Sequence, residues 1–371
     1  MTQNMFHPLR PLALAAVAGL LAASCSLMPS ASGGRPVSDG STRTTAGGPD
    51  GAPGQAAPPV ATGFAPGSVP RLASGWILAI GSLNEPEIWT AAQQLGATRF
   101  ILIGQADGET KGAYDEAKLR RAIGERVPAG YRGLAQLDFE GRWIAYLNAP
   151  EDSPTFREGE AALLRLLTVA RQVRPEAQWS IYGLPSVPFW LPLQGQPTRS
   201  WFDATPEAQA PARAKARRAQ AVIDACDWVA PSVYVPYLPS RDDPKVLAVQ
   251  AGYARAKTAI AVELAKGKPV LPMTWHRVHD SNKVDGGKRL TPDEMIEGQI
   301  KPAIEAGAAG VVWWGSDGML VRTVGRDVPR PPDVPPSAYN DADAMRRWVV
   351  REHVRMLNEL AADMNRIRRS P

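Results

Sequence analysis

The stretch "YRGLAQLDFE" (131–140) is a short, mainly apolar run that ends in two carboxylates, Asp138 and Glu140. Its apolar residues are nearly continuous rather than alternating with polar ones, which is typical of a strand buried on both faces of a parallel sheet. A buried charge costs several kcal/mol even after relaxation. The two acids at the end of this strand therefore either meet water and partner groups or take part in chemistry.

The same kind of strand recurs from Leu72 onward, each time followed by a helical pattern. The further strands are expected at 75–81, 98–104, 177–185, 227–237, 268–278 and 309–318. The helices are expected at 85–97, 113–128, 155–175, 205–226, 245–267, 291–308 and 341–370. Strands that alternate with helices predict βαβ units. About seven or eight units in roughly 300 residues match one α/β domain, a (β/α) TIM-type barrel in regular or distorted form. A doubly wound open sheet is the alternative, but no Gly-rich nucleotide-binding fingerprint follows any strand.

Composition and charge narrow the function classes. The 371 residues are 44% hydrophobic and 21% charged, as in globular proteins. A net charge of +5 favours polyanionic partners slightly, but there is no clustered basic stripe of the kind that nucleic-acid binders carry. The basic run from Arg213 to Arg218 has the spacing of a solvated helix face. No nucleic-acid partner is expected, and the sequence does not indicate an oligomeric state.

The N-terminal part predicts export and a lipid anchor. Residues 1–25 contain Arg10, an apolar run and the ending "LAASC", which together look like a signal peptide with a lipoprotein cleavage box at Cys25. An ordinary cleaved signal with an incidental cysteine is the alternative. Residues 26–70 are rich in Gly, Pro, Ala, Ser and Thr and predict a disordered tether. We therefore expect a folded domain at 71–371, held at a membrane of the cell envelope by the lipid.

Cysteines and histidines give little sign of a metal site. The second cysteine, Cys226, stands alone in an apolar stretch and is expected to be a small buried hydrophobe. His276 and His279, in "TWHRVHD", have no third ligand close by, which favours a loop or strand-edge role over metal binding. No metal or organic cofactor is expected.

In a barrel, the C-terminal ends of the strands meet at one mouth, where catalytic residues lie. Asp138 and Glu140 point to the same side of their strand because side chains alternate, and Tyr182, Tyr234 and Trp314 end three other strands. Two close carboxylates cannot both ionise cheaply, so one tends to keep its proton and can act as a general acid. Such an i, i+2 pair suits glycosidases in which the 2-acetamido group of the substrate is the nucleophile.

Plainer interpretations stay open for each of these residues. The acid pair could cap neighbouring helices or pair with Arg142. Tyr182, Tyr234 and Trp314, taken singly, also fit aromatic residues of the core or rim.

Four segments together resemble the hyaluronidase family of glycoside hydrolases. They follow one another in the family's order, at similar spacing, and the resemblance covers about residues 72–365. The segments are "RGLAQLDFEGRW", "ARQVRPEAQWSIYGLP", "WVAPSVYVPY" and "LTPDEMIEGQIKPAIEAGAAGVVWWGS". The resemblance implies a (β/α) barrel hydrolase that cuts β-linked N-acetylhexosamine bonds with retention. It implies that Glu140 is the acid/base, that Asp138 orients the acetamido group, and that Tyr182 and Tyr234 complete that pocket.

The resemblance also implies substrate-binding residues. Trp314 would line the sugar site, and Arg142 and Arg255 would face the substrate. Here "EGRW" is shorter than the family's turn after the glutamate, so Arg142 is displaced, and the family's disulfides are absent. The expected function is that of an exported, hyaluronidase-like hydrolase of N-acetylhexosamine polysaccharides. A chitinase-like or peptidoglycan-trimming hydrolase and a glycan-binding lipoprotein without turnover are the alternatives.

Overall fold

The computed structural model of the chain describes residues 69–81, 85–186, 192–193, 196–200, 205–240, 243–315, 317–325 and 330–367. The expected signal peptide, Cys25 and nearly all of the expected tether lie outside these residues. None of the described helices is both long enough and apolar enough to span a bilayer.

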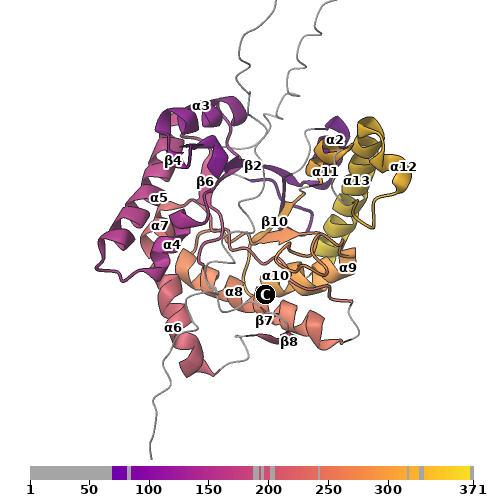
Figure 1. Cartoon of the computed structure of the whole chain (residues 1–371). Helices are drawn as coiled ribbons and strands as arrows, with labels where there is room; N and C mark the ends of the chain where they lie inside the picture. Colours follow the sequence, from indigo (N-terminus) through magenta and orange to yellow (C-terminus); the bar gives the residue numbers. More distant parts are fainter. Residues whose placement is uncertain are drawn as a thin grey trace, which may run out of the picture.

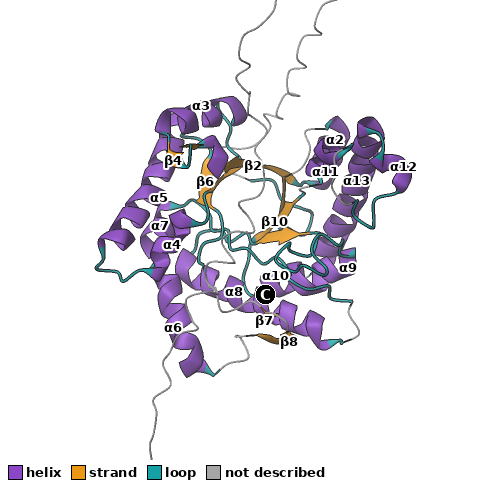
Figure 2. Ribbon diagram, in the orientation of Figure 1, coloured by secondary structure: helices purple, strands orange, loops and turns teal. Residues whose placement is uncertain are grey.

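Six parallel strands form one curved sheet in the order β6-β5-β2-β1-β10-β9. They are β1 (Ile77–Gly81), β2 (Thr98–Gly104), β5 (Leu134–Asp138), β6 (Gln178–Ile181), β9 (Met273–Trp275) and β10 (Gly310–Trp314). The first strand pairs with the last along its whole length, from Ile77 opposite Gly310 to Gly81 opposite Trp314. In Figure 2 the strands surround the centre of the molecule and the helices lie outside them.

An extended segment at 229–233 joins the two edges of this sheet. Gly183 N–H of the chain after β6 donates to the Ala230 carbonyl at 2.9 Å, and Met273 N–H of β9 donates to the Pro231 carbonyl at 2.8 Å. Pro231 has no N–H to donate, so the strand expected at 227–237 is reduced to isolated bridges. The α/β barrel prediction is confirmed, in a distorted form with six regular strands and this irregular seventh position.

The long helices follow the expected positions closely. They are α2 (Pro86–Leu95), α3 (Glu116–Arg126), α5 (Pro154–Val173), α8 (Lys245–Ala265) and α13 (Ala342–Arg366). Side-chain caps begin several of them; Ser153, for example, accepts a hydrogen bond from Phe156 N–H at the start of α5. Shorter elements complete the chain: α4 (Arg142–Ala145), α11 (Gly318–Thr323), α12 (Pro336–Tyr339), β3 (Glu109–Thr110), β4 (Ala113–Tyr114), β7 (Pro192–Leu193) and β8 (Gln196–Ser200).

Two helices expected as single units are divided. The region 205–226 forms α6 (Pro206–Arg217) and α7 (Gln220–Ala225). The region 291–308 forms α9 (Pro292–Met295), a π-helical turn (Ile296–Ile300) and α10 (Lys301–Glu305). Pro302 lacks the N–H that an α-helix needs at this point, and the wider π turn directly before it is a common way to absorb such a gap.

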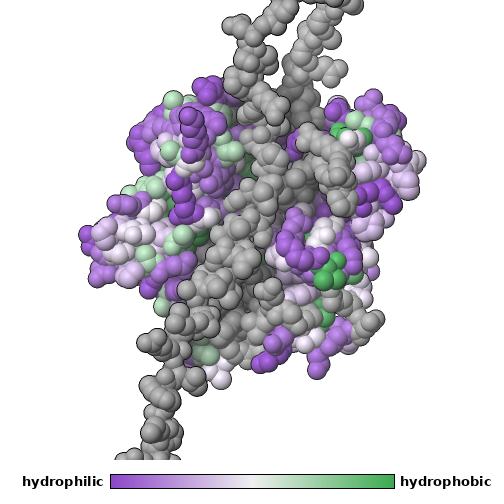
Figure 3. Space-filling model, viewed as in Figure 1, coloured by the Kyte–Doolittle hydropathy of each residue, from purple (hydrophilic) through white to green (hydrophobic). Residues whose placement is uncertain are grey.

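The core has an inner and an outer part. Leu134, Phe100 and Leu271 fill the interior of the barrel, whereas Leu137 and Phe139 face the layer between the sheet and the helices. These five residues are at most 4% exposed, and each such side chain contributes about 2 kcal/mol when buried. On the face that Figure 3 shows, the described surface is mainly hydrophilic, with small, separate hydrophobic areas.

The last helix packs beside the first part of the barrel. Figure 1 shows α13 next to α2 and α11. Trp76 Nε1 donates to the Ile367 carbonyl at 3.0 Å, and Ser74 N–H donates to Asn365 Oδ1 at 2.9 Å. The two ends of the described chain are therefore joined directly.

Candidate active site

The C-terminal edge of the barrel carries the candidate site. The strand register places Gly104 opposite Asp138, Gly81 opposite Trp314, and Trp314 opposite Trp275. These residues are the last ones of their strands, so they lie at the edge of the barrel that forms the mouth. The two glycines contribute no side chain there, and a Cβ at Gly81 would lie 2.8 Å from the Phe100 ring.

Asp138 and Glu140 stand on the same side of the end of β5. Asp138 keeps part of its side chain exposed, whereas its Oδ1 is enclosed without a hydrogen-bond partner among the described residues. Burial raises the pKa of Asp138 well above its usual range, and the charge of Glu140 and a hydrogen bond between the two carboxyl groups raise it further. Asp138 therefore keeps its proton to higher pH than an ordinary aspartate does. Gly141 has φ 60°, a left-handed conformation that lets the chain turn directly after Glu140.

Two tyrosines stand next to the carboxyl pair. Tyr182 N–H donates to the Leu137 carbonyl at 3.0 Å, which places Tyr182 beside Asp138. The ring centroids of Tyr182 and Tyr234 are 6.3 Å apart. The structure thus brings the carboxyl pair, both tyrosines and Trp314 to the same edge of the barrel.

Trp275 and His279 belong to the same group, although the sequence did not single them out for it. The Trp275 ring centroid is 5.6 Å from that of Tyr234, and the His279 ring lies nearly parallel to Tyr234 at 6.2 Å. His279 Nδ1 accepts a hydrogen bond from Ser281 N–H at 3.1 Å, and burial lowers the pKa of His279. The ring is therefore neutral, with its proton on Nε2. The sequence signal that could have indicated His279 as a site residue is its place in "TWHRVHD", directly after the strand expected at 268–278.

The two arginines of the prediction do not join this group. Arg142 is exposed and pairs with Glu109 at 2.8 Å, with its guanidinium over the Trp143 ring. Arg255 lies in the outer layer of helices, where it pairs with Glu305 of α10 at 2.6 Å. Each arginine is held by a carboxylate of its own surroundings rather than by the mouth.

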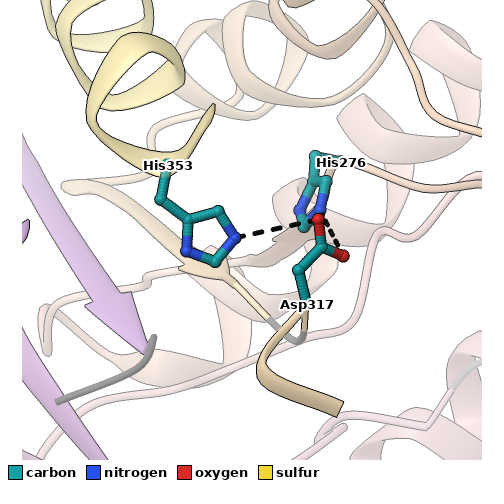
Figure 4. Close-up of side chains that lie close together, drawn as sticks. All are labelled: His276, Asp317 and His353. Atoms are coloured by element: carbon teal, nitrogen blue, oxygen red, sulfur yellow. Dashed lines mark ion pairs between the residues drawn. The ribbon is translucent and has the colours of Figure 1, made fainter. Parts of the chain in front are cut away.

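A second buried polar cluster lies behind the ends of β9 and β10. His276, Asp317 and His353 come from three separate elements and place one ligand atom each within 4.8 Å of one another (Figure 4). His276 lies directly after β9, at the strand edge as expected, but it has two possible ligands nearby, contrary to the expectation that no third ligand is close. They were hidden because Asp317 and His353 are distant in the sequence.

The donor set fits an ion-pair network better than a metal site. Trp313 Nε1 donates to His276 Nδ1 at 3.1 Å, and burial lowers the pKa of His276, so the ring is neutral and its proton is on Nε2. That protonated atom is the one that faces Asp317, at 3.0 Å. Arg277 donates to both oxygens of Asp317, at 2.7 and 3.0 Å. A cation would have to displace the His276 proton and the guanidinium together.

Comparisons with known proteins place the fold. No model of a protein family matches the chain, and no curated protein sequence is similar to it. Among solved structures, the chain is similar to bee venom hyaluronidase, with a TM-score of 0.52 and 15% identity over 78% of this chain and 100% of that one. A second structure of bee venom hyaluronidase, in complex with a hyaluronic acid tetramer, gives a TM-score of 0.51 and 15% identity over 79% of this chain and 99% of that one. The chain therefore shares the barrel fold of bee venom hyaluronidase.

Proposed function

We propose that the chain is an exported glycoside hydrolase that cleaves β-linked N-acetylhexosamine polysaccharides with retention. The observation that carries this proposal is the carboxyl pair at the end of β5, where burial and the neighbouring Glu140 raise the pKa of Asp138. Tyr182 and Tyr234 stand next to the pair. The likeness in fold to bee venom hyaluronidase supports the same assignment.

The proposed reaction takes one proton from the carboxyl pair and returns another to it. The first proton passes from Asp138 to Glu140 through their hydrogen bond, and Glu140 donates it to the glycosidic oxygen as the bond to C1 breaks. The acetamido oxygen of the substrate attacks C1, and the ionised Asp138 stabilises the positive charge that develops on the acetamido group. Glu140 then takes a proton from water, whose oxygen attacks C1 and reopens the ring that the acetamido group formed. Two displacements at C1 give retention.

The aromatic residues have positioning roles in this proposal. The Tyr234 hydroxyl would hydrogen-bond the acetamido oxygen, and Tyr182 would close the pocket on the other side. Trp314 offers a flat apolar face to the sugar ring.

The test is an assay of the full chain against a panel of N-acetylhexosamine polymers, with new reducing ends as the readout. Glu140→Gln should lower turnover at least ~100-fold, as expected for a lost general acid, with substrate binding retained. Asp138→Asn should cost a comparable factor. The glycan-binding lipoprotein gives a different result: the unsubstituted chain binds oligosaccharide but does not shorten it, and neither substitution changes that binding.

A neutral polymer, as in chitinase-like activity, is the second candidate substrate. Hyaluronan carries a carboxylate on every second sugar, which calls for a cation near the site. Arg142 and Arg255, the two arginines expected to supply one, are engaged by Glu109 and Glu305. The panel therefore includes chitin oligosaccharides beside hyaluronan, and the ratio of their kcat/KM values decides between the two.

Export and lipidation complete the proposal. The signal-like residues 1–25 and the tether composition of 26–70 support an anchor at Cys25. Cys25→Ala should release the chain from the membrane fraction. Membrane association that is unchanged by this substitution would contradict lipidation.

A further inference from the structure

The loop between β2 and α3 packs against the turn after β5, which carries Glu140. A Cβ at Gly108 of this loop would lie 2.7 Å from the Phe139 ring, so the loop and the strand end are in direct contact. The Tyr114 ring of β4 meets the Trp143 ring of α4 edge-on, with the ring centroids 5.7 Å apart. Figure 1 shows β4 and α4 on the same side of the barrel. The loop and the turn therefore form one packed unit at this edge.

Two side chains of the loop bind three groups of the turn. Gln105 Oε1 accepts a hydrogen bond from Glu140 N–H at 3.3 Å, and Gln105 Nε2 donates to Glu109 Oε2 at 3.0 Å. Glu109 Oε1 accepts from Trp143 Nε1 at 2.7 Å and from the Arg142 guanidinium at 2.8 Å. Gln105 and Glu109 thus form a brace that links the loop to Glu140 itself and to the first two residues of α4.

The loop that carries the brace is itself anchored on both sides. Asp107 accepts from Gly104 N–H of β2 at 2.9 Å with one carboxylate oxygen and from Arg126 of α3 at 2.6 Å with the other. Lys118 of α3 donates to the Glu109 carbonyl at 2.8 Å. The position of the brace is therefore set by a strand and a helix of the barrel.

The residue type at position 105 matches this arrangement. A backbone N–H needs an acceptor and a carboxylate needs a donor, and the glutamine amide offers both in one group. A glutamate in place of Gln105 would set two carboxylates against each other across the 3.0 Å contact with Glu109. A methionine has a similar length but would bond neither partner.

We infer that Gln105 and Glu109 are positioning residues for Glu140 in its proton transfer to the leaving oxygen. This inference rests on the proposed function. A general acid must lie within hydrogen-bond reach of the atom that it protonates, and a displacement of about 1 Å can cost ~100-fold in rate. Gly141 permits the turn after Glu140 but has no side chain that could hold it, so the brace does this. Arg142 serves the site through Glu109 instead of through the substrate.

The kinetic test compares two substrates that differ only in their leaving group, the phenyl and dinitrophenyl β-glycosides of one N-acetylglucosamine oligosaccharide. Phenolate needs a proton from the general acid as it leaves, whereas dinitrophenolate leaves without one. In the full chain, Gln105→Met should lower kcat/KM for the phenyl glycoside about 10- to 100-fold and leave that for the dinitrophenyl glycoside nearly unchanged.

The matched control is Thr110→Val in the same loop, where the Thr110 hydroxyl bonds only within the loop, to Asp115. It should leave kcat/KM unchanged for both substrates. A Gln105→Met chain that loses the same factor on both substrates has general damage, and one that loses nothing has no brace. Either result would overturn the inference.

A second measurement needs no turnover. Exchange of Glu140 N–H with deuterated water is followed by mass spectrometry with residue-level fragmentation. Gln105→Met removes the acceptor of this N–H and should speed its exchange by ~10-fold, whereas Thr110→Val should leave the rate unchanged. A Glu140 amide that exchanges in the unsubstituted chain as fast as a free amide would refute the brace, and this outcome requires no variant to fold. Faster exchange in a Gln105→Met chain, together with no cleavage of either glycoside by the unsubstituted chain, would support the brace and count against the proposed function.

Discussion

The buried His353 of α13 predicts how acid destabilises this protein. Burial holds the pKa of His353 at about 3, against 6.5 for an ordinary histidine. Because the folded-state pKa is the lower of the two, the unfolded chain binds a proton between pH 6.5 and 3 and the folded chain does not. The free energy of unfolding therefore falls as the pH drops below 6.5, and this loss ends near pH 3.

The size of the effect follows from one proton. Each pH unit in this interval costs about 1.4 kcal/mol, so His353 alone removes about 2 kcal/mol between pH 7 and pH 5. Urea unfolding of the full chain and of His353→Gln at a series of pH values measures this. The slope of stability against pH should be smaller in the variant by about 1.4 kcal/mol per unit between pH 6 and pH 4. All other groups contribute alike to both chains.

The comparison of slopes is independent of any loss in the free energy of unfolding that the substitution causes equally at every pH. Arg351→Gln is the control, because Arg351 is exposed on the same helix and its replacement leaves the buried histidine in place. It should keep the wild-type slope. Equal slopes for wild type and His353→Gln would show that His353 is protonated in the folded state over this range, and the reasoning from burial would be wrong.

Three further predictions test other parts of the structure. Gly310→Ala should destabilise the chain by about 3 kcal/mol in urea unfolding, because the new Cβ would lie 1.9 Å from the Ile77 carbonyl oxygen. The control Gly124→Ala, whose Cβ meets only a side-chain atom at 3.9 Å, should be neutral or stabilising by up to about 1 kcal/mol. Equal losses of stability in the two variants would contradict the packing argument. Asp317→Asn should cost about 3–5 kcal/mol because it leaves a buried guanidinium with less charge compensation; a thermal midpoint equal to that of wild type would refute this. Tyr234→Phe should lower kcat about 10- to 100-fold if its hydroxyl bonds the acetamido group, and unchanged kcat would exclude that role.

The fold was predictable because its signals are local. The strand at 98–104 was expected with the bounds that β2 has, since a continuous apolar run between two helical patterns defines it. Two of the errors fall at prolines. Pro231 and Pro302 each remove a backbone donor. The residues around Pro231 form isolated bridges, and those before Pro302 form a π turn. A pattern of apolar residues reports which face is buried but not how the backbone accommodates a missing N–H.

The site was predictable only where one strand carries it. Alternation alone places Asp138 and Glu140 on the same side, and the ends of other strands supply the two tyrosines. Trp275 lies at such an end too, but an aromatic residue in an apolar strand looks like core in the sequence. Lys257, a buried lysine of α8, could not be found in this way, because its burial depends on how that helix packs against the barrel.

The hydrogen bond between Ser74 and Asn365 has a consequence for circular permutation of the chain. Since the two ends of the barrel domain meet, a linker of a few residues could connect them, and new termini could be opened in the exposed turn near 151–152. Such a circular permutant would pair β1 with β10 as sequence neighbours instead of as the most distant strands of the domain. The connection between these two strands would consist of the segment that holds α11, α12 and α13 and the linker, which is shorter than their natural separation, so the permutant should refold faster than the natural chain order allows.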